Sequence, residues 1–219
     1  MVEPNYKIKI MENEITKAAD SELKNFLSTL IDSKKLPTHI KTVEDAFTIA
    51  QMGKELGFPT MQAFHYIIPI QGKLSLSAKA TNALLRKGGI KFYTKEDGVY
   101  VYKDGSTSEM RKEGEENPID RRTTIVFTRD DMEETCSFTW SDASGQGLNT
   151  KDNWKRMPRE MLYARCLAKG ANRVGADLLL GLYMTEELTD SFNVPETAVK
   201  RNDDGTIKEI VDVTHTEIK

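Results

Sequence analysis

The stretch between Lys151 and Arg173 concentrates positive charge in a chain that is acidic overall. It holds seven Lys or Arg residues and two acidic ones, whereas the whole chain of 219 residues has a net charge of −3. On a helix that turns about 100° per residue, five of these cations fall within an arc of about 120°. A row of cations without interspersed acids is typical of a surface that binds phosphate groups. The five residues are Lys155, Arg159, Arg165, Lys169 and Arg173.

The apolar residues of the same stretch predict a buried face that does not overlap the cationic one. Pro158 suits the first turn of the helix, where its missing N–H costs nothing. We therefore expect one face to pack on a sheet and the other to present the five cations to an anionic partner. A solvated helix face is the competing interpretation. The apolar arc spans about 140° and contains Met157, Met161, Ala164, Leu167, Ala168, Ala171 and Val174.

Two further residues of this stretch do not follow the charge pattern. Trp154 stands just before the helix, where it either stacks on an unpaired base or anchors the core. Glu160 falls on the apolar arc. Because a buried carboxylate needs a partner, we expect it to form a structural ion pair with Arg156 or with a cation from a strand.

A second basic region lies nearer the N-terminus, in the run LSLSAKATNALLRKGGIKFY. Its cations either line the same groove as the basic helix or are ordinary surface charges. They are Lys73, Lys79, Arg86, Lys87 and Lys91. For Arg121 and Arg122, at the start of a predicted strand, a binding role and the solvated charge of the preceding loop both remain open.

The sequence contains no constellation typical of an enzyme, so we predict no catalytic residue, no metal and no cofactor. It lacks the G-x-x-x-x-G-K-[ST] run of ATPases. Its three histidines are scattered, and Cys136 and Cys166 are expected to be buried thiols in a reducing cytosol. The acids between residues 130 and 134 could hold a divalent ion for a nuclease, although solvated turn charges explain them better.

The N-terminal half of the sequence predicts helices followed by a hairpin. Spaced apolar residues predict a helix over residues 12–31 and another over residues 43–56, with Thr42 as the N-cap of the second and Gly57 at its end. The run YIIPIQGKLSLS alternates around Gln71-Gly72, which predicts a short hairpin or a bent strand. The proline in its first strand would keep that strand at an edge or a bulge.

The rest of the chain predicts a helix and a group of strands. A helix should run from Ser77 to the glycine pair at residues 88–89. The runs IKFYT, GVYVY, TTIVFTR and ETCSFTW are typical of antiparallel strands. SDASGQGLNTKD is predicted to be a loop, and DDGTIKEIVDV either a small hairpin or disordered. The fold class is therefore α+β, with a small antiparallel sheet of hairpin plus meander packed by helices.

Three segments are predicted. Residues 1–41 form a helical segment for oligomerisation or a lid, residues 42–190 form the core domain, and residues 191–219 form a polar, flexible, acidic tail that is dispensable for folding. No apolar run has the length of a membrane span, and the N-terminus lacks the apolar stretch of a secretory signal. We expect no membrane association and a cytoplasmic location.

Several short motifs, in a shared order, resemble the phage single-strand annealing proteins of the Redβ/RecT superfamily. The pattern Trp–x–x–x–Pro–Arg–x–Met–Leu, from Trp154 to Leu162, is similar to the signature helix of that family. IIPIQGKLSLSAKATNALLRKGGIKFY resembles its hairpin plus helix, and TIVFTRDDMEETCSFTW resembles its paired strands. The resemblance covers residues 42–183.

The resemblance implies a non-enzymatic protein of phage DNA recombination that acts in the cytoplasm of a bacterial host. Such proteins bind single-stranded DNA and anneal complementary strands without nucleotide hydrolysis. They form rings or helical filaments that hold single strands and annealed duplex in a positive groove. A phage exonuclease is the implied partner. The acidic tail of this chain could recruit a host single-strand-binding protein or a nuclease. Arg159 and Arg165 match the family's DNA-contacting cations, and Trp154 matches its tryptophan.

Two other classes of function remain open at this point. The chain could be a non-enzymatic phage or host protein-interaction module on the same fold. A metal-dependent nuclease is the third hypothesis. Each hypothesis predicts a different result. An annealing protein accelerates annealing, an interaction module makes protein contacts, and a nuclease cleaves DNA when magnesium is present.

Overall fold

The computed structural model describes residues 20–111, 117–192, 199–201 and 207–210. Its internal contacts divide the chain into two compact units, residues 1–64 and residues 65–219. The structural division thus falls after residue 64, whereas the predicted boundary lies at residue 41. The predicted tail belongs to the second unit.

The described part of the N-terminal unit is helical. Residues 20–32 form a helix, and the remainder of the predicted first helix lies outside the described residues. Helix α2 (Val43–Glu55) begins at a capping box, as predicted: the Thr42 hydroxyl accepts from the Asp45 N–H at 3.1 Å, and the Asp45 carboxylate accepts from the Thr42 N–H at 3.1 Å. Gly57, with φ 71°, follows the C-cap.

A hairpin opens the second unit after helix α3 (Thr60–Tyr66), which the sequence pattern did not predict. Strands β1 (Ile67–Ile70) and β2 (Lys73–Leu76) pair antiparallel around Gln71 and Gly72, whose φ values of 46° and 78° match a type I′ turn. Strand β2 also pairs parallel with β7 (Tyr183–Met184), which leaves β1, with its proline, at an edge. The predicted hairpin and edge strand are confirmed.

Helix α4 (Ala78–Lys87) confirms the helix predicted from Ser77 to the glycine pair. The Ser77 hydroxyl caps it by accepting from the Ala80 N–H. Gly88 follows at its C-terminal end. A Cβ on Gly88 would stand 2.2 Å from the Leu178 side chain, so this glycine lets α4 approach α8 (Ala176–Leu179) closely.

The larger sheet is antiparallel, in the order β4-β3-β5-β6, so β4 pairs with one edge of β3 and β5 with the other. Its strands are β3 (Lys91–Val101), β4 (Thr107–Ser108), β5 (Asp120–Arg129) and β6 (Met132–Thr139). The two strands predicted from IKFYT and GVYVY are one strand, β3, whose register against β5 shifts twice between Thr94 and Val99. This irregular stretch contains Asp97 and Gly98. The α+β class and the small antiparallel sheets packed by helices are confirmed.

The segment predicted as the loop SDASGQGLNTKD begins with a helix, so that prediction is wrong. Helix α5 (Trp140–Gly145) starts at a capping box between Thr139 and Asp142. A 3₁₀ turn, η1 (Leu148–Thr150), follows. The glycines that indicated a loop lie at and beyond the end of α5 rather than inside it.

The basic stretch forms two helices rather than one, α6 (Asp152–Arg156) and α7 (Pro158–Val174). The break is at Met157, whose φ of −134° and ψ of 58° are not helical. A residue before proline is disfavoured in the helical region because of a clash with the proline ring. Pro158 occupies the first turn of α7, as predicted.

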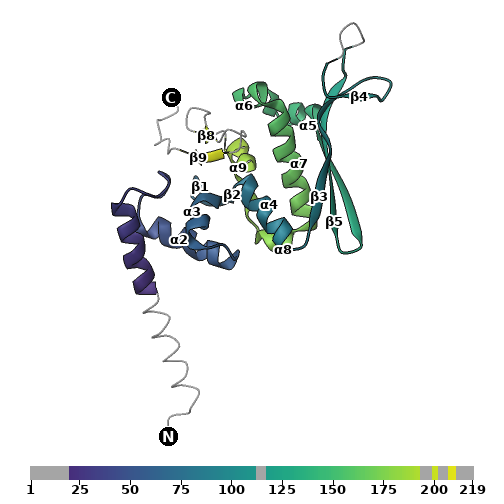
Figure 1. The fold of residues 1–219 in the computed structure, drawn as a ribbon. Helices are drawn as coiled ribbons and strands as arrows, with labels where there is room; N and C mark the ends of the chain where they lie inside the picture. The colour runs from purple at the N-terminus through teal and green to yellow at the C-terminus, as the bar shows by residue number, and fades with distance from the viewer. Residues whose placement is uncertain (1–19, 112–116, 193–198, 202–206, 211–219) are drawn as a thin grey trace. The chain divides into compact units, whose positions relative to one another are not determined.

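Helix α7 lies at the centre of the second unit. It contacts β3, β5 and β6 on one side and α4, α8 and α9 (Thr185–Ser191) on the other. Figure 1 shows α7 in green along the long strands, with α4 on its other side. This helix is therefore buried from two directions.

The described part of the predicted tail forms an antiparallel pair, β8 (Val199–Arg201) and β9 (Ile207–Ile210). Ile207 is only 2% exposed and packs with Ile68, Ile70 and Leu188. This packing argues against the expectation that the whole tail is flexible and dispensable for folding. None of the described helices combines the length and apolarity needed to cross a membrane.

Candidate functional site

The face of α7 that meets the sheet is not the predicted one. Buried Leu162, Cys166 and Gly170 form a stripe at intervals of four residues. The Cys166 thiol donates to the Cys136 carbonyl at 3.2 Å, and a Cβ on Gly170 would stand 2.1 Å from the Phe127 ring. This stripe runs through the arc of the predicted cations, so the prediction of two separate faces is wrong. Four of the five cations, Lys155, Arg159, Lys169 and Arg173, are nevertheless exposed, as predicted.

The predicted apolar arc is buried as well, for example at Met161, Leu167 and Ala171. The reason is the central position of α7, which needs apolar contact with the sheet and with the helices behind it. Cys166 and Gly170 are small enough to bring the helix close to β5 and β6. The long cationic side chains flank this stripe and extend outward past the sheet.

Three of the predicted cations lie on the β6 side of α7. Arg165 donates from Nη2 to Gln146 Oε1 at 2.7 Å, and its guanidinium carbon lies 5.7 Å from the centre of the Phe138 ring. Lys169 Nζ donates to the carbonyl of Ser137 at 3.1 Å. Both of these acceptors are neutral.

Arg173, the third of these cations, is paired with an acid. Its Nη1 lies 2.5 Å from the Glu134 carboxylate. This carboxylate raises the pKa of Arg173 and offsets its charge. Arg173 is therefore a weaker candidate for phosphate binding than the sequence suggested.

Arg159 lies on the opposite side, against β3. Its Nε and Nη2 donate to Asp97 Oδ2 at 2.8 and 2.6 Å, and this contact raises its pKa. Gly98, at φ 63°, has no side chain to obstruct it, since a Cβ there would stand 2.8 Å from Arg159 Cγ. Because β5 separates β3 from β6, Arg159 and the β6-side cations do not form one row.

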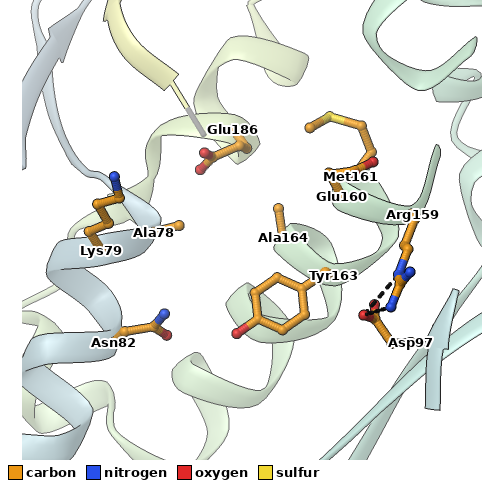
Figure 2. A pocket seen from close by; sticks show the side chains of 10 residues that line it. All are labelled: Ala78, Lys79, Asn82, Asp97, Arg159, Glu160, Met161, Tyr163, Ala164 and Glu186. Carbon is orange, nitrogen blue, oxygen red and sulfur yellow. Dashed lines mark hydrogen bonds and ion pairs between the residues drawn. The ribbon is translucent and has the colours of Figure 1, made fainter. Parts of the chain in front are cut away.

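Arg159 and Lys79 line opposite sides of a cavity of about 310 Å³ between α4 and α7 (Figure 2). Three carboxylates, from Asp97, Glu160 and Glu186, line the same cavity. With three acids and two cations, it suits phosphate poorly. Glu160 is exposed at this cavity, so the predicted buried ion pair of this residue is wrong.

Trp154 is fully buried and anchors the core. Its Nε1 donates to Asp190 Oδ2 at 3.4 Å, and its ring centre lies 6.2 Å from Phe138 and 6.1 Å from Trp140. Of the two interpretations of Trp154, the structure supports core packing. The alternative, that Trp154 stacks on an unpaired base, is incompatible with this fully buried position.

The second basic region does not gather around α7. Lys73 Nζ lies 5.4 Å from the centre of the Phe192 ring, and the Arg86 guanidinium carbon lies 5.2 Å from that of Phe92. Lys79 alone among the described cations of this region lines a cavity with a cation of α7. Lys73 and Arg86 are thus separate surface positions.

The two arginines of β5 differ in their partners. Arg122 forms a bidentate ion pair with Glu96 at 2.8 and 2.7 Å, which lowers the pKa of Glu96. Arg121 donates from Nε to the Gly98 carbonyl at 2.7 Å, and its guanidinium carbon lies 4.9 Å from the centre of the Tyr100 ring. Within the described ranges, the Arg121 guanidinium makes no ion pair with a carboxylate.

The acids between residues 130 and 134 lie at the tight turn from β5 to β6, where Asp130 has φ 52°. Within the described ranges, no three His, Cys, Asp or Glu side chains are grouped so that they could hold a metal ion. Both cysteines are buried and free, and burial raises the pKa of Cys166 to about 12.

Comparison with protein-family models, with curated proteins and with solved structures finds no match to this chain. The resemblance to the phage annealing proteins therefore stays a prediction from the sequence motifs.

Proposed function

We propose that this protein binds single-stranded DNA through its phosphates and anneals complementary strands. One observation carries the proposal. Within the described part of the chain, three of the five predicted helix cations, Lys155, Arg165 and Lys169, make no ion pair with a carboxylate. The charges of Lys155 and Lys169 are available to an anionic partner, whereas the charge of Arg165 also attracts the carboxylates of Glu187 and Asp190.

The spacing of these cations suits a polymer of phosphates. Arg165 and Lys169 are one helical turn apart, which places side chains about 5–6 Å from each other along the β6 side of α7. Phosphate contacts bind strands of any sequence and weaken as salt rises. They leave the Watson–Crick edges of the bases free, as annealing requires. The resemblance of the sequence motifs to those of phage annealing proteins supports the same proposal.

The paired arginines contribute less under this proposal. Arg159 and Arg173 bind a phosphate only after leaving Asp97 and Glu134, respectively. The nuclease alternative lacks a supporting observation, because the described residues contain no group of side chains that could hold a metal.

Fluorescence anisotropy with a labelled single strand of mixed sequence tests the proposal. We expect binding at about 50 mM salt that falls steeply toward about 200 mM. Lys169→Ala should weaken binding and shallow the slope of log affinity against log salt by about one. Lys54→Ala is the matched control, since it removes an exposed lysine from α2 in the N-terminal unit.

Two outcomes would contradict the proposal. One is the absence of binding at about 50 mM salt. The other is an equal change of slope for Lys169→Ala and Lys54→Ala, which would assign the effect to net charge rather than to the cations on the β6 side of α7.

A further inference from the structure

We infer that a cavity beside Trp140 binds one unpaired base of the DNA strand and makes the protein select single strands over duplex. This inference rests on the proposed function and assigns the site at which a base is held. The cavity has a volume of about 430 Å³ and is formed by residues of β3, β5, α5, α6 and the start of α7. Pockets for small organic ligands typically measure about 300–1,000 Å³.

Trp140 supplies a fixed aromatic wall. It lies on the buried Trp154, with ring centres 6.1 Å apart and an interplanar angle of 57°. Trp154 is itself held by the core and by its hydrogen bond to Asp190. Trp140, which remains partly exposed, is therefore preorganised, and little side-chain entropy is lost when a base stacks on it.

Tyr100 and Arg121 supply a second flat wall. The Arg121 guanidinium lies over the Tyr100 ring at 4.9 Å, and its Nε is held by the Gly98 carbonyl at 2.7 Å. A guanidinium fixed in this way can stack on a base while its charge attracts phosphate. The irregular stretch of β3 that contains Gly98 thus positions Arg121.

The charge of the cavity also suits a nucleotide. Lys155 stands at the cavity as an exposed cation, so Arg121 and Lys155 supply two positive charges. Asp120 is the acid among the described lining residues, and its Oδ1 accepts from the backbone N–H groups of Arg121 at 2.7 Å and Ser141 at 3.1 Å. In this cavity the cations outnumber the acids, whereas in the cavity lined by Arg159 the acids outnumber the cations.

The occupant must be an unpaired base. A base inside a duplex is stacked and paired, and moving it into a pocket costs a few kcal/mol. A single strand presents its bases without that cost. The aromatic contact therefore favours single strands, whereas the phosphate contacts favour any DNA.

The test compares a deoxythymidine oligonucleotide with an abasic strand of equal length, which carries the same phosphates and no bases. Stacking of one base predicts that the wild-type protein prefers the base-bearing strand by about fivefold to 150-fold. Trp140→Leu should remove most of this preference and leave binding of the abasic strand unchanged. Circular dichroism checks that the variant is folded.

Ile119→Asp is a second variant that does not depend on the aromatic core. Ile119 lines the cavity and is 63% exposed, so its replacement leaves the core intact and puts a carboxylate beside the base. It should reduce the preference at least fivefold, on the order of one lost stacking contact. Met61→Asp, at a 43% exposed position of α3, should not change it.

Each result supports or overturns a different statement. Equal affinity of the wild-type protein for the two strands overturns the base site and leaves the proposed DNA binding intact. Binding of neither strand overturns the proposed function itself. A preference that survives in both Trp140→Leu and Ile119→Asp overturns the assignment of the base to this cavity.

Discussion

Arg159 and Asp97 form an ion pair that competes with phosphate for the same guanidinium. Both Arg159 nitrogens donate to one carboxylate oxygen, and the two side chains are 54% and 39% exposed. Such exposed pairs are worth at most about 1 kcal/mol. Breaking the pair should therefore change ligand binding more than folding.

Asp97→Asn is predicted to raise the affinity for single-stranded DNA and to steepen the salt slope by about one, because it frees one cation. Fluorescence anisotropy at several salt concentrations measures both. Asp177→Asn makes the same change of charge at another ion pair, that of Arg129, and should have a smaller effect. Equal effects of the two variants would refute a specific role for Arg159.

Glu187 is a partly buried acid whose ionisation opposes folding. Burial raises its pKa, and the charge of Arg165 and the Met184 N–H lower it only in part. A raised acid pKa means that stability is full below the unfolded pKa and is lost as pH rises through the folded pKa. The Oε2 atom is buried and has no hydrogen-bond partner among the described residues.

Glu187→Gln should therefore raise the free energy of unfolding at neutral pH. The gain should shrink as pH falls toward about 4.3, the usual pKa of Glu, because the wild-type carboxyl is then neutral too. Urea denaturation at both pH values measures this difference. A loss of stability at neutral pH would show that the attraction to Arg165 outweighs the burial.

At the scale of elements, the close contact between α7 and the sheet depends on Gly170. Gly170→Ala is predicted to destabilise the protein by about 1–3 kcal/mol, because its Cβ would overlap the buried Phe127 ring. Gly145→Ala is the matched control, since no atom lies within 4 Å of its added Cβ. Chemical denaturation compares the two, and equal stability would contradict the packing described here.

Elements with local signals were predictable from the sequence. The capping box at Thr42, the turn at Gln71-Gly72 and the cap at Ser77 each depend on residues within four positions of one another. Helix α5 was missed even though it has the same kind of cap, because its glycines suggested a loop. The continuity of β3 was missed because it depends on pairing with β5, which the local sequence does not encode.

The candidate site was harder to predict than the fold. A helical wheel shows which residues share a face, but it does not show how many neighbours the helix has. For α7, the sheet and the helices behind it both need apolar contacts, so Cys166 and Gly170 face the sheet between the cations. The partners of Arg159 and Arg173 come from distant strands and were beyond prediction.

Trp140 is a candidate site residue that the sequence did not indicate. The run ETCSFTW contains it, but no spacing relates it to Tyr100, Arg121 or Lys155, which the fold brings to one cavity. A tryptophan at the end of a predicted strand, directly after the cap residue Thr139, was the signal available for it. The sequence suggested Trp154 as the stacking residue, but Trp154 lies in the core and packs beneath Trp140.

At the scale of the whole molecule, the C-terminal strands complete a hydrophobic cluster. Ile207→Ala is predicted to destabilise the second unit by about 2–5 kcal/mol, because Ile207 packs with Ile68, Ile70 and Leu188. Lys208→Ala, at an exposed position of the same strand, should change stability little. Thermal unfolding compares the two variants. Equal stabilities would restore the expectation of a dispensable tail.

The rate of annealing of fluorescently labelled complementary strands tests the central claim most directly. Two pairs of strands with unrelated sequences are mixed with and without the protein. Phosphate binding that leaves the base edges free predicts acceleration of both pairs at about 50 mM salt and loss of the effect toward about 200 mM. No acceleration, or acceleration of one sequence alone, would contradict it.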